Sequence, residues 1–257
     1  MKKGAKRASA KKHRARSARA KDVDRIPTGI PHFDAFIEGG FEKRSTNLIV
    51  GGPGSGKSIL ATQVLMNGMM RGEHCLYITF EERKDEFYRN MLRFGWDLAE
   101  YEKRGLFTFL EYTPSKVRLM LEEGGGIIES IVLKKKVTRI VIDSITSFVL
   151  LFEDELAKRE ASLKLFNMVS NWNCTSFLTL ETNPAEKEKL DARAMEFETD
   201  SIILLYFIRS TTQRERYLEV LKMRGTRHSK SMYRFHITDR GIVVESSPRT
   251  KPPQAIR

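Results

Sequence analysis

The residues of this chain best suited to chemistry lie in one glycine-rich segment that ends in a lysine and a serine. The segment reads Gly51-Gly52-Pro53-Gly54-Ser55-Gly56-Lys57-Ser58, which fits the phosphate-binding pattern G-x-x-x-x-G-K-[ST], the P-loop. Glycines let backbone N–H groups face a phosphate without a Cβ in the way, and a following helix adds partial positive charge. Lys57 could then reach the β- and γ-phosphates of a nucleoside triphosphate, and the Ser58 hydroxyl could ligate Mg²⁺. The residues expected to bind ATP are Gly52, Pro53, Gly54, Ser55, Gly56, Lys57, Ser58 and Ile59.

A second candidate residue, Asp143, ends an apolar run. Residues 139–142 are typical of a buried strand, and Asp143 follows them directly. An acid in this place is typical of the Walker B motif, whose aspartate holds Mg²⁺, usually through water. Any buried strand can end in an aspartate, but beside a P-loop the pattern indicates that Asp143, like Ser58, contributes to a metal site that binds Mg²⁺.

Two adjacent acids, Glu81 and Glu82, follow the apolar run 75–80. We expect this run to be the strand next to the P-loop strand. A carboxylate at its end could then reach a water in line with the γ-phosphate, orient it and take its proton. The alternative is that both are surface acids at the start of a helix, where the helix dipole favours negative charge. Position alone leaves both interpretations open.

Two cations, Lys222 and Arg224, flank Met223 after another apolar run. Residues two apart in an extended segment point to the same face, so both could act on one phosphate. Cations aimed at a γ-phosphate accelerate phosphoryl transfer by about 10³–10⁵ in related enzymes. The alternative is a solvated basic edge, and the sequence does not say whose phosphate the pair would meet.

These side chains must be positioned by elements that alternate between strand and helix. The runs that predict strands are residues 47–50, 75–80, 106–111, 139–142, 176–180, 201–207, 216–221, 233–237 and 241–244. The patterns that predict helices are residues 59–71, 84–95, 127–136 and 156–172. This order predicts an α/β fold with a mostly parallel central sheet and helices on both faces. Since no helix separates the last three strands, the C-terminal edge of the sheet should be antiparallel.

The net charge of +12 is concentrated at the N-terminus. Residues 1–21 hold ten lysines or arginines and no acid, so the rest of the chain carries 35 basic against 33 acidic side chains, a net charge of +2. Such a segment cannot form a core. We therefore expect a disordered basic tail over residues 1–22, one globular domain over residues 23–246 and a flexible tail over residues 247–257. The basic tail would be either a contact to nucleic acid or another acidic surface, or a solvated extension.

Other features of the sequence indicate the cellular location of the chain. The sequence contains no run of about 18 apolar residues, so no membrane span is expected. Its basic N-terminus lacks the apolar core of a secretory signal. The two cysteines, Cys75 and Cys174, lie in or beside apolar runs and are expected to be buried thiols. A cytoplasmic location follows.

Further short strings follow one another in a fixed order along the chain. They are Arg25-Ile26-Pro27-Thr28-Gly29-Ile30 with Phe33-Asp34 and Gly39-Gly40, Thr79-Phe80-Glu81-Glu82, Phe94-Gly95-Trp96-Asp97-Leu98, Ile142-Asp143-Ser144-Ile145-Thr146, Lys222-Met223-Arg224-Gly225-Thr226 with His228 and Lys230, and Ile237-Thr238-Asp239 with Gly241. Together with the P-loop they resemble the KaiC-like branch of the RecA superfamily over roughly residues 24–245. The resemblance implies a RecA-like P-loop NTPase core and an ATPase that forms a hexameric ring with ATP at the subunit interfaces.

The resemblance also implies roles for single residues. Glu81 would be the water-activating base, with Glu82 beside it. Lys222 and Arg224 would be fingers that act in trans on the nucleotide of the neighbouring subunit. The residues implied to line that neighbour's nucleotide are Met223, Thr226, His228 and Lys230.

The chain departs from the circadian clock proteins of this family in two ways. Those proteins carry two such domains, whereas this chain has one. Their phosphorylated domain has a Ser-Thr pair before the strand that here starts near Ser201, but residues 196–200 read Glu-Phe-Glu-Thr-Asp. Autokinase chemistry is therefore not expected of this chain.

Three functions remain open from the sequence. The first is a slow, oligomeric ATPase with a regulatory or switch role. The second is a DNA-binding recombinase-paralogue ATPase in repair or recombination, which the basic tail favours. However, the loops that would contact DNA, residues 146–154 and 183–191, are not strongly basic. The third, a nucleotide-binding scaffold without turnover, is disfavoured by Glu81, Lys222 and Arg224.

Overall fold

The computed structural model describes residues 23–124, 126–182, 198–209 and 213–249. The predicted N-terminal tail, the loop 183–191 and residues 250–257 lie outside the described residues. The strands are β1 (Arg25–Ile26), β2 (Phe41–Glu42), β3 (Thr46–Gly51), β4 (His74–Thr79), β5 (Phe107–Glu111), β6 (Val137–Asp143), β7 (Thr175–Glu181), β8 (Ser201–Arg209), β9 (Arg214–Met223), β10 (Tyr233–Thr238) and β11 (Gly241–Val244). The helices are α2 (Phe33–Phe36), α3 (Lys57–Met70), α4 (Lys84–Leu92), α5 (Leu98–Lys103), α6 (Pro114–Glu122), α7 (Gly126–Lys135), α8 (Ile145–Val149) and α9 (Glu155–Asn171).

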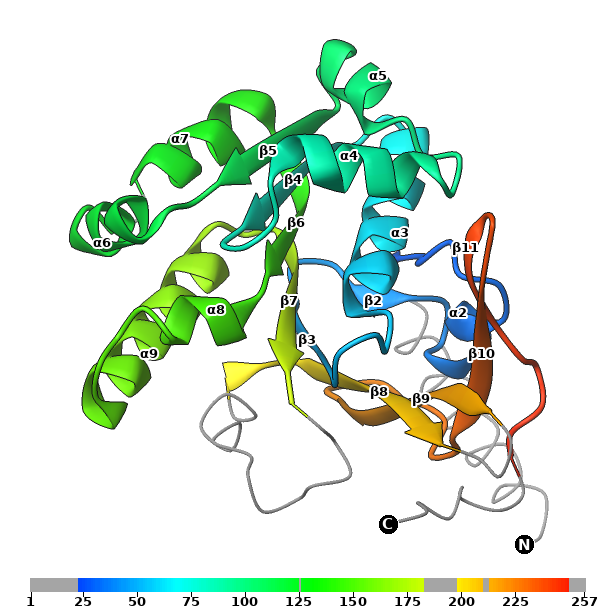
Figure 1. Cartoon of the computed structure of the whole chain (residues 1–257). Coiled ribbons are helices and arrows are strands. Elements are labelled where there is room, and N and C mark those ends of the chain that lie inside the picture. The colour runs from blue at the N-terminus through cyan, green and yellow to red at the C-terminus, as the bar shows by residue number, and fades with distance from the viewer. Residues whose placement is uncertain (1–22, 125, 183–197, 210–212, 250–257) are drawn as a thin grey trace, which may run out of the picture.

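One large sheet organises the chain, in the strand order β11-β10-β9-β8-β3-β7-β6-β4-β5 (Figure 1). The strands from β8 to β5 in this order pair in parallel. The pairs β8–β9, β9–β10 and β10–β11 are antiparallel. The expected α/β fold, with a mostly parallel sheet and an antiparallel C-terminal edge, is therefore confirmed.

The strand order corrects one expectation. Strand β4, which leads to Glu81 and Glu82, is not next to β3, because β7 and β6 lie between them. β4 follows β3 along the chain, but the later strands β6 and β7 fill the space between the two. Both acids still reach the P-loop end of the sheet, since these parallel strands all end on the same side of it.

Helices cover both faces of the sheet, and each face has its own core. Successive side chains of a strand point to opposite faces, so Ile49 joins one core whereas Leu48 and Val50 join the other. The first core contains residues of α3, α4, α5 and the β10–β11 hairpin. The second contains residues of α6, α7, α8 and α9. In Figure 1, α8 and α9 accordingly lie across the sheet from α3. Strand β3 is thus buried on both sides, which fixes the base of the P-loop.

Short helices account for most differences from the predicted elements. The predicted helix 84–95 ends at Leu92, because Gly95 adopts φ +75° in the left-handed region and its N–H bonds the Leu92 carbonyl at 2.9 Å. Helices α5, α6 and α8 were not predicted. The start of α5 carried a readable signal, since the Asp97 side chain accepts from the Glu100 N–H at 3.0 Å as an N-cap.

Two predictions from composition, on the cysteines and on a membrane span, can be compared with the structure. Cys75 and Cys174 are both buried and free, as expected. Within the described ranges, no helix combines the length and apolar character that a membrane crossing needs.

Candidate functional site

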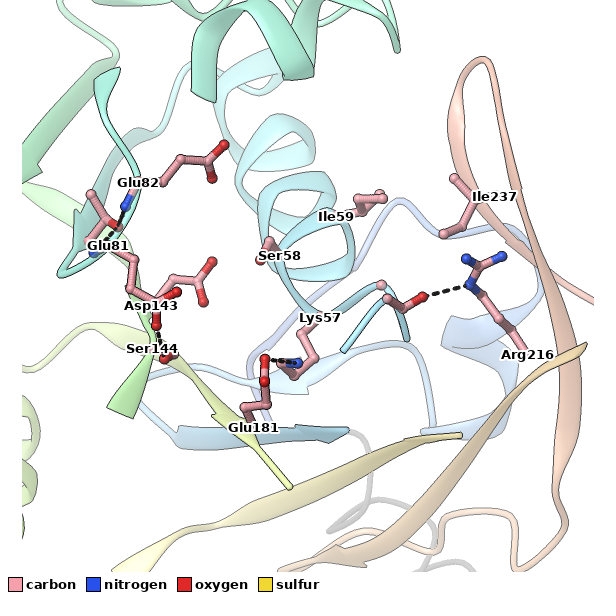
Figure 2. A pocket seen from close by; sticks show the side chains of 13 residues that line it. Lys57, Ser58, Ile59, Glu81, Glu82, Asp143, Ser144, Glu181, Arg216 and Ile237 are labelled. Atoms are coloured by element: carbon pink, nitrogen blue, oxygen red, sulfur yellow. Dashed lines mark hydrogen bonds and ion pairs between the residues drawn. The ribbon is translucent and has the colours of Figure 1, made fainter. Parts of the chain in front are cut away.

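A cavity of about 390 Å³ opens where β3, β4, β6 and β7 end (Figure 2). The residues that line it are Gly54, Gly56, Lys57, Ser58, Ile59, Thr79, Glu81, Glu82, Asp143, Ser144, Glu181, Arg216 and Ile237. The predicted P-loop, the predicted metal residues and both predicted acids therefore lie around one space, although they come from three strands and a helix.

The P-loop backbone has the shape that an anion site needs. Gly54 and Gly56 adopt φ +71° and +101°, in the left-handed region that favours glycine. Gly56 is also the N-cap residue of α3, and no side chain of the described residues caps that helix end. The N-terminus of α3 thus presents uncapped N–H groups and partial positive charge to the cavity, which fits a phosphate.

Ser55 differs from its neighbours in the loop. Its side chain is fully buried, and its Oγ has no hydrogen-bond partner among the described residues. The Oγ points back toward the strand, since a Cβ built on Gly51 would lie 2.5 Å from it. Its N–H bonds the Gly52 carbonyl at 3.2 Å. Ser55 therefore supports the loop from below and does not line the cavity.

Lys57 is held over the loop by two oxygen atoms. Its Nζ donates to the Gly52 carbonyl at 3.1 Å and to Glu181 Oε2 at 3.3 Å. The lysine is only 8% exposed, whereas the side chain of Glu181 is 47% exposed. A triphosphate that bound Lys57 would take the place of the Glu181 carboxylate, which can turn toward solvent.

Ser58 and Asp143 are brought together by a buried tyrosine. The Tyr77 hydroxyl donates to Asp143 Oδ2 at 2.6 Å and lies near Ser58. Thr179 donates to the other Asp143 oxygen. Burial raises the pKa of Tyr77 well above its ordinary value, and the Asp143 carboxylate adds to this. Tyr77 therefore stays a neutral donor that fixes the carboxylate beside the Ser58 hydroxyl.

This donor set fits Mg²⁺ bound together with a nucleotide. Across the part of the chain that the structure describes, no cluster of three or more histidines, cysteines or acids could form an all-protein metal site. Mg²⁺ is usually held by one or two protein oxygens together with substrate phosphates and water. A hydroxyl and one carboxylate next to a phosphate cradle match that requirement.

The two predicted acids have different surroundings. Ser144 Oγ donates to Glu81 Oε1 at 2.9 Å, and Asn90 Nδ2 donates to Glu82 Oε1 at 3.0 Å. Partial burial raises the pKa of Glu82; the Asn90 bond opposes this, and repulsion from nearby acids, Asp143 first, adds to it. In Figure 2, Glu82 points toward Ser58, whereas Glu81 turns toward Asp143 and Ser144. Both are within the cavity, so either carboxylate could orient a water.

Arg216 lines the opposite wall of the cavity and was not predicted. Its Nε donates to the Gly54 carbonyl at 3.0 Å, and its guanidinium lies 4.3 Å from the centre of the Phe207 ring. Burial lowers its pKa from the ordinary value, but an arginine remains charged at neutral pH. The cavity therefore holds two cations, Lys57 and Arg216, on either side of the loop (Figure 2).

Arg216 and Glu181 were missed for different reasons. Glu181 ends a parallel strand, and the reasoning that selected Glu81 could have selected it too. Arg216 lies within β9 and carries no motif. It reaches the cavity because the antiparallel ladder sets it opposite Phe207, two residues beyond the Leu205 that pairs with Gly51.

The predicted fingers lie near the opposite ends of the strands, at the side of the sheet where β3 and β8 begin. Ser201 pairs with Met223 on one side and with Asn47 on the other. Asn47 precedes Gly51 by four residues of extended strand, a distance of about 13 Å. Lys222 and Arg224 flank Met223, so both lie far from the P-loop of their own chain.

The other residues implied to line a neighbour's nucleotide are near these two cations. The Thr226 hydroxyl accepts from Arg25 Nη2 at 2.8 Å, and His228 Nδ1 lies 2.9 Å from the Ser229 carbonyl. Lys230 is exposed. Met223 is 8% exposed and belongs to the core, so only its backbone could reach another subunit. None of these four lines the cavity of its own chain.

Known proteins resemble this chain over most of its length. Residues 26–249 match the KaiC ATPase family. A UPF0273 protein of Pyrococcus furiosus is 34% identical over 235 residues, which are 86% of this chain and 94% of the relative. The circadian clock protein KaiC3 of Synechocystis is 31% identical over 230 residues, 86% of this chain but 46% of the relative.

A solved structure agrees with the fold. The crystal structure of a KaiC-like protein from Pyrococcus horikoshii is 36% identical, with a TM-score of 0.78, over 87% of this chain and 99% of that one. The RecA-like core is therefore confirmed, and the P-loop of such a domain supports nucleotide binding. Family match, sequence identity and fold agree: this chain belongs to the KaiC-like ATPase family.

Proposed function

We propose that this chain binds ATP with Mg²⁺ and hydrolyses it slowly, as a subunit of a cytoplasmic hexameric ring with a regulatory or switch role. The observation that carries the proposal is the division of the site between the two ends of the central strands. One end holds the phosphate cradle, the metal residues and the acids. The opposite end of the strands presents Lys222 and Arg224, about 10 Å or more along the strands from their own cradle.

Each group of residues around the cavity has a role in the proposed binding and hydrolysis of ATP. The loop N–H groups and Lys57 bind the β- and γ-phosphates. Ser58 and Asp143 would hold Mg²⁺, which neutralises charge on the phosphate oxygens. Glu81 orients a water and takes its proton, while Glu82 stands beside it as the competing candidate for the base. Arg216 lies along the loop at Gly54, where it adds positive charge to the phosphate cradle.

The fingers complete the site from the next subunit. In a head-to-tail ring, Lys222 and Arg224 would meet the phosphates of the neighbouring protomer's nucleotide. Arg224 would then stabilise charge that develops on the γ-phosphate in the transition state, with Lys222 beside it. In this arrangement the Met223 backbone and the side chains of Thr226, His228 and Lys230 face the neighbour's nucleotide.

Mixed assemblies test the shared site. Lys57→Ala subunits should bind no nucleotide but still offer fingers, whereas Arg224→Ala subunits should bind nucleotide but lack a finger. Each variant alone should be nearly inactive. Co-expressed in equal amounts and purified through a tag on each, they should regain up to about a quarter of wild-type turnover, because random mixing sets a finger against an intact cradle at that share of ring interfaces. Mixed assemblies without regained turnover would contradict a site shared in trans.

A second function is favoured by one observation, the ten cations and no acid in residues 1–21. Under this alternative the chain is a DNA-binding recombinase-paralogue ATPase, and the tail contacts phosphates. The test is ATP turnover with and without single- and double-stranded DNA, for the full chain and for a chain that starts at Asp22. Stimulation by DNA that is lost with the tail would favour this function over the first.

A further inference from the structure

Two consecutive residues before β8, Thr199 and Asp200, hold both predicted fingers. Lys222 Nζ donates to the Thr199 carbonyl at 2.7 Å. The Arg224 N–H donates to the Asp200 carbonyl at 2.8 Å, and Arg224 Nη1 lies 3.5 Å from Asp200 Oδ1. One short segment therefore contacts both cations, and it contacts Arg224 through backbone and side chain together.

The same segment is fixed to the strand that carries the P-loop. The Thr46 N–H donates to Asp200 Oδ2 at 2.9 Å, and the Asp200 N–H donates to the Thr46 carbonyl at 2.8 Å. Thr199 is fully buried. Thr46 is the first residue of β3, and β3 ends at Gly51, where the P-loop begins. Asp200 thus joins the base of the P-loop strand to the Arg224 finger.

We propose that Asp200 is a positioning residue for Arg224 and links the finger to the P-loop strand of its own subunit. This inference rests on the proposed function, in which Arg224 acts on the neighbour's nucleotide. One carboxylate oxygen is held by the Thr46 N–H, which leaves the other directed at the guanidinium. A long arginine side chain loses rotamer freedom when it meets a phosphate, and a carboxylate that already limits its positions reduces that loss.

The ion pair between Asp200 and Arg224 is expected to add little to the free energy of unfolding. Their side chains are 41% and 55% exposed, and exposed ion pairs contribute little to stability. The pair is therefore better explained by where it holds the guanidinium. A change at Asp200 should lower turnover without a matching loss of nucleotide affinity in the same subunit.

Mixed assemblies with Asp200→Asn placed in one subunit at a time provide the test. Asparagine keeps an oxygen for the Thr46 N–H, whereas the atom that faces Arg224 becomes an uncharged NH2 group that cannot accept from the guanidinium. In the Lys57→Ala subunit, which supplies the finger, D200N should lower the regained turnover by about two- to fivefold, within the range of an exposed ion pair. In the Arg224→Ala subunit, which supplies the cradle, it should change nothing.

Controls separate positioning from general damage. Asp24→Asn removes another exposed ion pair, Lys43 Nζ–Asp24 Oδ2 at 2.7 Å, and should leave turnover unchanged in either subunit. The Kd for a fluorescent ADP analogue and the Tm of each assembly report nucleotide binding and folding. The expected result is a lower kcat with the Kd unchanged.

Three outcomes would overturn the inference. Equal loss of turnover with D200N in either subunit would mean that Asp200 acts through the sheet and not through Arg224. No loss in either subunit would mean that the Asp200 charge does not position the finger. If Lys57→Ala and Arg224→Ala subunits fail to complement while Asp200 is intact in both, the shared site itself fails, and the role of Asp200 fails with it.

Discussion

The charged side chains at the two ends of the central strands differ in their contacts and in their exposure to solvent. At the P-loop end the ionisable groups contact one another across a cavity: Lys57 pairs with Glu181, and Asp143 accepts from two hydroxyls. At the opposite end of the strands Lys222 donates to a backbone carbonyl, and Arg224 pairs with Asp200 where both side chains are exposed, to 55% and 41%. Under the proposed function, the first end binds the nucleotide, whereas the second meets the nucleotide of a neighbouring subunit.

The largest effect that would sharpen this contrast is expected from Glu81→Gln. Loss of a general base typically slows a reaction by about 10²–10⁴-fold, and the amide should leave ATP bound because Glu81 does not touch the phosphate cradle. Turnover by phosphate release and affinity by nucleotide titration check this. Glu82→Gln is the matched control. If Glu82→Gln abolishes hydrolysis and Glu81→Gln does not, Glu82 is the base.

A smaller effect is expected from Glu181→Gln. The Glu181 carboxylate occupies Lys57 and would repel an incoming triphosphate, so its removal should tighten ATP binding by about two- to fivefold, the range of a partly exposed ion pair. ADP, which has no γ-phosphate, should gain less. Calorimetric titration of both nucleotides gives the two Kd values, with the exposed Glu153→Gln as control. Weaker ATP binding would show that Glu181 helps to hold the nucleotide instead of competing with it.

The smallest effect concerns stability at the P-loop end. The pKa of Glu82 lies above its ordinary value of 4.5, chiefly through partial burial. A carboxyl with a raised folded-state pKa contributes stability at low pH that is lost as pH rises through that pKa. Without nucleotide, Glu82→Gln should therefore raise the Tm at pH 7 by about 1–2 °C, and the difference should vanish below about pH 4. A constant difference across this pH range would contradict it.

Local sequence was enough for the nine strands of the large sheet and for the four helices α3, α4, α7 and α9, but not for α5, α6 and α8 or for Glu181 at the end of β7. The apolar run before Asp143 and the glycines before Lys57 each carry their signal within a few residues. The position of β4 in the sheet could not be inferred in the same way, because β6 and β7, which separate it from β3, come much later in the chain. Neighbours along the sequence need not be neighbours in a parallel sheet.

Residues that reach the site through long-range pairing were also beyond local prediction. Arg216 enters the cavity only because β9 pairs with β8 in a register that sets Arg216 opposite Phe207. Asp200 contacts Thr46 although 154 positions separate them. The fingers themselves were indicated by family resemblance, and only the ladder showed that they lie at the end of the strands away from their own P-loop.

The separation of cradle and fingers has a consequence for counting sites. Under the proposed function, each active site needs one interface, and each interface joins the cradle of one subunit to the fingers of the next. An open row of subunits then always has one cradle without fingers, whereas a closed ring has none. Closure of the ring therefore completes the last active site without the addition of a subunit. The number of active sites per subunit would thus be highest in the closed ring.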